Sequence, residues 1–415
     1  MKALPQRVQK KVLYVESNTD GTVGGSHFSL LLLLEGLNKK IYSPVVIFYQ
    51  EHRLIPRFQQ ADCRVLLLTK RKPLDISEYF PRMKTKSNNR IIYLFLIIPL
   101  LIFQKGINYF KTFVLPTFNC WQILRRENIS LIHLNNTLLR PQEWIFASLF
   151  TKARIIAHER GINNFFPFHS RFWARFLKAI ICISDAVKNN LLKYGFPEKQ
   201  LSRIYNGLDP NKFAVTVSKE EILKELGVEK DCPIIGIVGN IKPWKGQETV
   251  VGSMKYVQKA FPNIKCLIIG GVSPNDRAYL VHLESIVKNE NLNDCILFTG
   301  QRNDIANLIN SLTVLIHASV LPEPFGRVLL EGMAMNKPVI TNNIGAGQEI
   351  VVDGKTGLIV NRGDPHCLAE AIISLLQNRK KALEMGRNGY DRLTEHFHAS
   401  HYVKQIEDLY AKILN

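Results

Sequence analysis

The stretch LPEPFGRVLLEGMA, residues 321–334, joins a loop rich in Pro and Gly to an apolar run that is typical of a helix. It follows VLIHAS (314–319), a short continuous apolar run that is typical of a buried strand. A strand, a loop and a helix in this order form the repeating unit of a parallel α/β fold. Glu323 lies in the loop and Glu331 interrupts the apolar run, where a carboxylate is costly unless it is hydrogen-bonded. The two acids are therefore either a helix cap with a second acid that reaches solvent, or part of a ligand site.

Segments of the same kind fill the rest of the second half of the chain. Each strand-like segment is a short apolar run bounded by Gly, Asn or Pro, as in strands that are buried on both faces of a parallel sheet. In chain order the segments are PIIGIVGN (233–240), a helix near 247–260, KCLIIGG (265–271), a helix near 277–289, CILFTG (295–300), KPVITNN (337–343) and TGLIV (356–360).

The first half of the chain shows the same alternation of strands and helices. Its segments are KVLYVES (11–17), a helix from about Ser26, SPVVIFYQ (43–50), ISLIHLNN (129–136), a helix from Pro141, RIIAHERG (154–161), AIICISDAV (179–187) leading into a helix that ends at Gly195, and RIYNGLDPNKF (203–213).

These patterns predict an α/β protein with two Rossmann-like domains in tandem. We assign residues 1–213 to the first domain and residues 232–390 to the second. The charged, helix-like segment 214–231 is predicted to connect them, and residues 391–415 are predicted to form a C-terminal helical segment.

The composition of the 415 residues, 46% apolar and 21% charged, is that of an ordinary globular protein. Seven scattered cysteines cannot all pair in disulfides, which favours a reducing compartment. The N-terminal sequence MKALPQRVQKKVLYVESN has basic residues but no apolar run after them, so we expect no secretory signal. The sequence therefore predicts a cytoplasmic protein.

The positive charge is concentrated in one half of the chain. Residues 1–210 contain 31 Lys and Arg against 13 Asp and Glu, whereas residues 211–415 contain 23 against 22. Such a basic field usually faces nucleic acid, anionic lipid or a phosphorylated substrate.

The run IIYLFLIIPLLIF (91–103) does not fit the α/β pattern. It is shorter than the roughly 20 residues that span a bilayer, and Pro99 interrupts it. It is either a buried helix of the first domain or, within an insertion near 82–111, a patch that dips into the membrane surface. We prefer the second interpretation because the run lies in the basic half. The predicted membrane contacts are Arg82, Lys84, Lys86, Arg90, Leu94, Phe95, Ile97 and Ile98.

The loops that follow the predicted strands are suited to a nucleotide-linked sugar. Gly326 lets the backbone approach a ligand closely, and the helix that follows offers free amides to a phosphate. In VGNIKPWKG (238–246), Lys245 is a natural cation for a diphosphate, and Gly345-Ala346-Gly347 supplies a further close-approach loop. Glu331 can accept hydrogen bonds from the two ribose hydroxyls, and Glu323 can accept one from a sugar hydroxyl.

Five motifs, in order along the chain, resemble those of the retaining glycosyltransferases of family 4. This resemblance covers most of the chain and implies the GT-B fold, in which two Rossmann-like domains face each other and a C-terminal helix returns to the first. The motifs are GGSHFSLLLLLEGL (24–37), IYNGLDPNKF (204–213), VGNIKPWKG (238–246), the Glu-x7-Glu block from Glu323 to Glu331, and the Gly-rich stretch that continues to Val360.

The resemblance implies roles for individual residues. Glu331 would bind the ribose, and Glu323 and Lys245 would take catalytic positions at the donor sugar and the diphosphate. Gly24 and Gly25 would let the first domain approach the reacting centre. His158 matches a histidine that the family places near the transferred sugar, although a capping or core role is the alternative. The diphosphate would lie against Asn240 and the backbone amides of Phe325, Gly326, Arg327 and Val328.

One position departs from the family pattern. Asn240 stands where the family usually has an arginine that pairs with the leaving phosphate, and neither Lys242 nor Arg327 is at the matching position. The sequence contains no Asp-x-Asp and no His/Cys cluster with metal-ligand spacing, so we expect no metal and no other cofactor.

The function predicted from these observations is sugar transfer from a UDP- or GDP-sugar to a saccharide acceptor, expected to be lipid-linked, in cell-surface glycan synthesis. The enzyme would work in the cytoplasm, on the inner face of the cytoplasmic membrane. The alternatives are a nucleotide-sugar epimerase of the same fold, which turns over donor without acceptor, and a polyanion-binding protein. For the latter, RFWARFLK (171–178) is the nearest candidate segment, but it is better explained as an amphipathic helix, and we expect no nucleic-acid partner.

Overall fold

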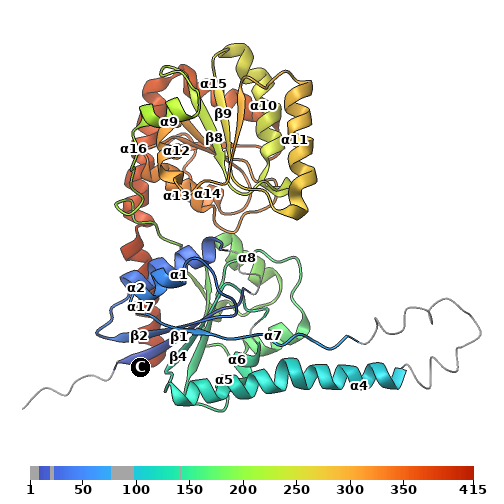
Figure 1. The fold of residues 1–415 in the computed structure, drawn as a ribbon. Coiled ribbons are helices and arrows are strands. Elements are labelled where there is room, and N and C mark those ends of the chain that lie inside the picture. The colour runs from blue at the N-terminus through green and yellow to red at the C-terminus, as the bar shows by residue number, and fades with distance from the viewer. Residues whose placement is uncertain (1–8, 19–22, 76–97, 141) are drawn as a thin grey trace, which may run out of the picture.

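The computed structural model describes residues 9–18, 23–75, 98–140 and 142–415. These residues form two α/β domains, one above the other in Figure 1, and each is built on a parallel sheet with helices packed around it. The tandem of Rossmann-like domains predicted from the sequence is therefore confirmed.

The first domain contains a seven-stranded sheet of order β3-β2-β1-β4-β5-β6-β7, in which all neighbouring strands are parallel. Residues 12–15, in the interior strand β1, are fully buried, as expected for a continuous apolar strand that is covered on both faces. Its strands are β1 (Lys10–Glu16), β2 (Tyr42–Phe48), β3 (Arg64–Leu67), β4 (Leu131–Asn135), β5 (Arg154–Glu159), β6 (Ile180–Cys182) and β7 (Leu201–Arg203). Its helices are α1 (Gly25–Gly36), α2 (Ile55–Gln60), α4 (Ile98–Tyr109), η3 (Phe110–Val114), α5 (Leu115–Arg126), α6 (Gln142–Ser148), α7 (Phe168–Ala174), α8 (Asp185–Lys193) and η4 (Glu198–Gln200).

The second domain contains a six-stranded parallel sheet of order β10-β9-β8-β11-β12-β13. The predicted connection 214–231 contains α9, which packs against α12 of this domain. The strands of the second domain are β8 (Ile234–Val238), β9 (Lys265–Ile269), β10 (Ile296–Gly300), β11 (Val314–His317), β12 (Val339–Asn342) and β13 (Gly357–Val360). Its helices are α9 (Lys219–Glu225), η5 (Pro243–Lys245), α10 (Gln247–Ala260), η6 (Pro274–Asp276), α11 (Arg277–Asn289), α12 (Ile305–Ser311), α13 (Arg327–Ala334), α14 (Gly347–Ile350) and α15 (Pro365–Gln377).

Two C-terminal helices join the domains. Helix α16 (Arg379–His396) packs against α13 and α15 of the second domain, and α17 (Ala399–Leu414) packs against α1 of the first. Tyr402, Ile406 and Tyr410 of α17 are buried there. In Figure 1 the two helices, at the red end of the colour bar, run down one side of the molecule. This arrangement confirms the predicted return of the C-terminal helix to the first domain.

A helical run formed by α4, η3 and α5 lies along the lower end of the first domain, and α4 extends beyond the sheet (Figure 1). No residue of α4 is fully buried, and Ile102 and Phe103 are 63% and 66% exposed. Residues 98–103 of the apolar run therefore do not form a core helix. Of the predicted membrane contacts, Ile98 begins α4, while Arg82, Lys84, Lys86, Arg90, Leu94, Phe95 and Ile97 lie outside the described residues.

Candidate active site

A cavity of about 880 Å³ lies between the two domains. Helix α1 and the loops after β4, β5 and β7 supply most of its first-domain wall. The loops after β8 and β11 and the segment from the end of β10 into α12 supply most of its second-domain wall. In open parallel sheets, ligands bind at the carboxyl ends of the strands, where the strand order reverses. Both sheets reverse their order at this edge, between β1 and β4 and between β8 and β11. The cavity is therefore the site that the topology itself favours.

The predicted pair Lys245 and Glu323 meets on the second-domain wall. The Nζ atom of Lys245 lies 2.7 and 2.8 Å from the two carboxylate oxygens of Glu323, and both side chains are largely buried. His317 Nε2, at the end of β11, donates to Oε2 of Glu323 at 2.8 Å, and Ser319 Oγ donates to the same oxygen at 2.6 Å. No role was predicted for His317 and Ser319 from the sequence. The sequence feature that could have indicated them is their position in VLIHAS, at the carboxyl end of a strand.

This arrangement decides the charge of Glu323. Burial disfavours the carboxylate, but His317 and Lys245 outweigh that cost and hold the pKa of Glu323 well below its usual range. Glu323 is therefore an anion with fixed orientation, able to accept a hydrogen bond from a sugar hydroxyl.

The loop before α13 presents backbone amides to the cavity. Gly326 adopts a left-handed conformation with φ of 86°, which a glycine accepts without strain. Phe325, Gly326, Arg327 and Val328 all line the cavity, and the first turn of α13 has amides without intrahelical acceptors. The backbone part of the predicted diphosphate site thus lies on the same wall as Lys245.

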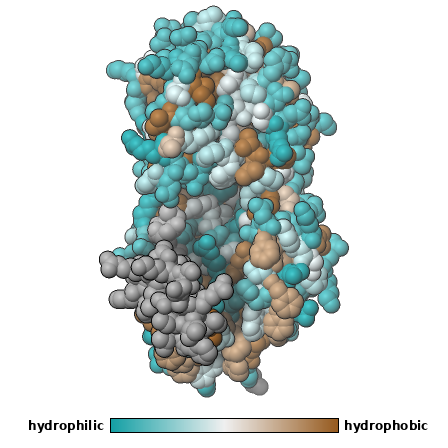
Figure 2. Space-filling view, turned by 90° about the vertical axis from the view of Figure 1, so that its right-hand side faces the viewer, coloured by the Kyte–Doolittle hydropathy of each residue, from teal (hydrophilic) through white to brown (hydrophobic). Residues whose placement is uncertain are grey.

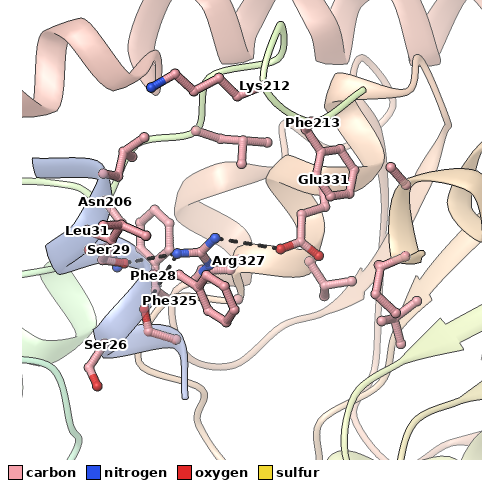
Figure 3. A pocket seen from close by; sticks show the side chains of 18 of the residues that line it. Ser26, Phe28, Ser29, Leu31, Asn206, Lys212, Phe213, Phe325, Arg327 and Glu331 are labelled. Carbon is pink, nitrogen blue, oxygen red and sulfur yellow. Dashed lines mark hydrogen bonds and ion pairs between the residues drawn. The ribbon is translucent and has the colours of Figure 1, made fainter. Parts of the chain in front are cut away.

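Glu331 also lines the cavity, one turn into α13. Its nearest ion-pair partner is Arg327, whose Nη2 lies 3.8 Å from Oε1 of Glu331 (Figure 3). Burial raises the pKa of Glu331, and the charges of Arg327 and Lys245 counter this rise. Because Arg327 is too far away for a short hydrogen bond, the Glu331 carboxylate can accept hydrogen bonds from a pair of ribose hydroxyls.

Arg160, on the first-domain wall, was not predicted from the sequence to be a site residue. This residue follows β5, lines the cavity and is 8% exposed. Its guanidinium donates to Oδ1 of Asn135 at 3.0 Å and to Oδ1 of Asn206 at 2.6 Å. Arg160 stands two residues after His158 in RIIAHERG. The sequence feature that could have indicated it is therefore a cation at the end of a buried strand.

His158 lies behind Arg160 and is fully buried, and it is not among the residues that line the cavity. Its Nδ1 lies 3.2 Å from Nη2 of Arg160 and 3.1 Å from Nε2 of His133. Because arginine can only donate, Nδ1 of His158 accepts and the neutral ring carries its proton on Nε2. Burial and the charge of Arg160 lower the pKa of His158 well below its ordinary value.

His133 continues this network to the C-terminal helix. Its Nε2 lies 3.1 Å from Nδ1 of His158, and its Nδ1 is hydrogen-bonded to the hydroxyl of Tyr410 on α17. Burial and Arg160 lower the pKa of His133 to about 3, so it is neutral at physiological pH. The returning helix thereby holds the histidines that support Arg160 in position.

The remaining predicted residues lie at the rim or outside the cavity. Gly24 caps the N-terminus of α1, and Gly25 lines the cavity. Asn240 is exposed and is not among the lining residues, whereas Gly239 before it is. Lys242 pairs with Asp276 at 3.8 Å, away from the cavity lining.

The described residues offer neither a metal-binding cluster nor a membrane-spanning helix. They contain no group of three or more His, Cys, Asp or Glu side chains placed to hold a metal ion. None of their helices has the length and apolar character needed to cross a membrane.

Comparison with known proteins identifies the family. The model of glycosyl transferases group 1 matches residues 218–392, and the model of Glycosyltransferase Family 4 matches residues 50–212. The chain belongs to the family 4 glycosyltransferases.

Curated relatives of this glycosyltransferase make different products. N-acetyl-alpha-D-glucosaminyl L-malate synthase of Bacillus anthracis is 23% identical over 74% of this chain and 83% of its own length. The lipopolysaccharide core biosynthesis mannosyltransferase LpsB of Rhizobium meliloti is 27% identical over 51% of this chain and 60% of its own. The capsular polysaccharide biosynthesis glycosyltransferase CapM of Staphylococcus aureus is 27% identical over 57% of this chain and 62% of its own length.

Solved structures show that the fold extends over almost the whole chain. The structure of Anabaena HepE in complex with UDP and glucose has a TM-score of 0.78 at 20% identity, covering 97% of this chain and all of HepE. A glycosyltransferase from Rickettsia africae also has a TM-score of 0.78 at 20% identity, covering 98% of this chain and 99% of its own. The GT-B fold predicted from the sequence is confirmed.

Proposed function

We propose that this glycosyltransferase moves a sugar from a UDP- or GDP-sugar to a hydroxyl of a saccharide acceptor, with retention at the anomeric carbon. The observation that carries the proposal is that Lys245, Glu323 and Glu331 share one wall of a cavity that faces the other domain. A cation, an oriented carboxylate and a second buried carboxylate match a diphosphate, a sugar and a ribose. HepE, which has the same fold, was solved in complex with UDP-glucose, and this supports a donor of that class.

In the proposed reaction, the bond between the anomeric carbon and the β-phosphate oxygen breaks and the diphosphate leaves with the bonding electrons. Lys245 and the amides before α13 stabilise the negative charge that develops on it. The acceptor hydroxyl forms the new bond on the same face of the sugar, and a leaving-phosphate oxygen takes its proton. When the diphosphate binds, Lys245 would share its charge between the phosphate and Glu323.

We propose that no metal ion takes part. An ammonium group and the N-terminus of a helix can together neutralise a departing diphosphate. The position of Lys245 beside the loop before α13 supports this mechanism.

We propose a lipid-linked saccharide as the acceptor, in the synthesis of a cell-surface polysaccharide or lipopolysaccharide. The names of LpsB and CapM support this class of product. In Figure 2, hydrophobic side chains are more numerous over the lower half of the visible face, which belongs to the first domain. Ile102 and Phe103 of α4 are exposed close to Lys105 and Lys111, a combination that suits the inner face of the cytoplasmic membrane.

The donor can be identified with a panel of UDP- and GDP-sugars. In excess EDTA and without acceptor, we expect slow release of the nucleoside diphosphate from one of them. Glu331→Ala should weaken binding of that nucleotide by roughly 1.5–3 kcal/mol, because a charged hydrogen bond to the ribose is lost. Calorimetry measures the affinity. An epimerised donor as product, unchanged affinity in Glu331→Ala, or activity only with added Mn²⁺ would contradict the proposal.

Membrane attachment can be tested by flotation with liposomes. We expect the protein to bind anionic vesicles, to be partly released by high salt, and to ignore neutral vesicles, because a short apolar insertion and basic residues act together. Replacing Ile102 and Phe103 by serine should reduce binding. The matched control replaces Val281 and Leu383, which are also exposed but lie in the second domain. Equal loss in both variants, or no binding by the wild type, would exclude this attachment.

A further inference from the structure

Two arginines from opposite domains line the same cavity. Arg160 belongs to the first-domain wall, and Arg327 begins α13 on the second-domain wall. The role expected for position 327 involves only its backbone amide, and none was expected for Arg160. Their guanidinium groups therefore have no function in the reaction as described so far.

Arg160 is a buried cation held by neutral groups. The partners of its guanidinium are the amide oxygens of Asn135 and Asn206, the ring of His158 and the hydroxyl of Tyr402 at 3.3 Å. Glu16 is the carboxylate that offsets its charge, but Asn135 lies between them and donates to Glu16 at 2.6 Å. A buried charge that lacks a directly bonded counter-ion is costly, so the position favours a bound anion.

Arg327 reaches out of its own domain. Its Nη1 donates to Oγ of Ser29 at 3.2 Å and lies 3.5 Å from the carbonyl oxygen of Gly25, both on α1 (Figure 3). A Cβ atom at Gly25 would lie 3.3 Å from Cδ of Arg327, so the glycine leaves room for this side chain. The distance of 3.8 Å to Glu331 is too long for a charge-assisted hydrogen bond. Arg327 thus bridges the domains without a tightly bound carboxylate.

The two guanidinium groups act on each other electrostatically. Burial lowers the pKa of Arg327, Glu331 counters this, and the positive charge of Arg160 lowers it further. Asn206, which accepts from Arg160, and Ser29, which accepts from Arg327, line the same cavity. The two cations therefore approach the same region of the cavity from opposite sides.

We propose that Arg160 and Arg327 form an anion site between the domains. This site binds a phosphate or carboxylate group of a substrate, and its cations are distinct from Lys245. Arginine is suited to this task because its planar fork binds such oxyanions through two parallel hydrogen bonds. The inference rests on the proposed function only in that it places the substrates in this cavity. The anion has two possible sources. One is the β-phosphate of the donor, which lacks the usual arginine partner because Asn240 stands at that position, and the other is a charged group on the acceptor.

The test uses the full chain, with Arg160→Gln and Arg327→Gln as variants. Arg57→Gln is the matched control, because Arg57 also lines the cavity but is already paired with Glu35 at 3.4 Å. Calorimetry measures the affinity for UDP and for GDP, and then for inorganic phosphate added to protein saturated with the tighter nucleotide. Arg160→Lys, which keeps the charge, shows whether a loss reflects the cation or the buried network.

If the anion is the β-phosphate, both glutamine variants should bind the nucleoside diphosphate on the order of tenfold more weakly, with the nucleoside monophosphate unaffected. If it is an acceptor group, nucleotide affinity should stay unchanged and phosphate binding should fall by a similar factor. Should Arg160→Gln not fold, Arg327→Gln decides alone. Wild-type affinity for both probes overturns the proposal, and so does a loss that Arg57→Gln shares. A wild type that binds no nucleotide contradicts the proposed donor, while inorganic phosphate alone still tests the arginine pair.

Discussion

Replacing Lys245 by alanine is expected to lower kcat/KM for sugar transfer by about 100- to 1,000-fold, because a fixed cation that meets the developing charge is usually a large catalytic contribution. Its ammonium is positioned by the two oxygens of Glu323 at 2.7 and 2.8 Å. The removal also leaves the Glu323 carboxylate with two side-chain partners, His317 and Ser319, so it is held less firmly for the donor sugar. Steady-state kinetics with the donor found in the panel measures the effect.

Lys242→Ala is the matched control for this experiment. Lys242 lies three residues earlier in the same loop, but its ammonium faces Asp276 and it does not line the cavity. We expect its kcat/KM to stay close to that of the wild type. Equal losses in the two variants would mean that the charge of the loop, rather than the position of Lys245, matters to the reaction.

Much of the fold was predictable because strands buried on both faces are continuous apolar runs. Helices α10 and α11 begin and end at the residues expected from the sequence, 247–260 and 277–289. For residues 91–103 a buried helix was only the alternative interpretation, and the continuation of this helix through η3 and α5 was not predicted. Helix α4 has no buried residue, so its apolar side chains do not form the one-sided stripe that marks a helix packed on a sheet. The exposed Ile102 and Phe103 show why the ordinary pattern fails there.

The site was predictable where its residues follow one another in a loop, and not where distant strands supply partners. Lys245 and the Glu323 loop were expected on the same wall, and they meet there. His317 was not expected to hold Glu323, since its place at the end of a strand indicates a site residue but does not say which side chain it contacts. Arg160 depends on Asn135, Asn206 and the returning helix, which only the tertiary structure brings together.

Replacing Gly345 by alanine is expected to lower both stability and activity. Gly345 has φ of 64°, and a Cβ atom there would lie 2.6 Å from the backbone nitrogen and oxygen of Glu323. The next amide, of Ala346, donates to that same oxygen at 3.0 Å. The loop was expected to approach a ligand closely, but its close approach here is to the backbone of Glu323. The substitution must therefore shift the carboxylate, and a displacement of about 1 Å in a catalytic group can cost on the order of 100-fold in rate.

Gly354→Ala separates the two causes of damage. Gly354 has nearly the same conformation, with φ of 70°, but a Cβ atom there meets nothing within 4 Å. Backbone strain alone should cost it about 1–2 kcal/mol of unfolding free energy and leave kcat/KM unchanged. Gly345→Ala should lose more stability in denaturant titrations and, in addition, at least about tenfold in kcat/KM. If the two variants behave alike, strain explains both, and the packing of Gly345 does not position Glu323.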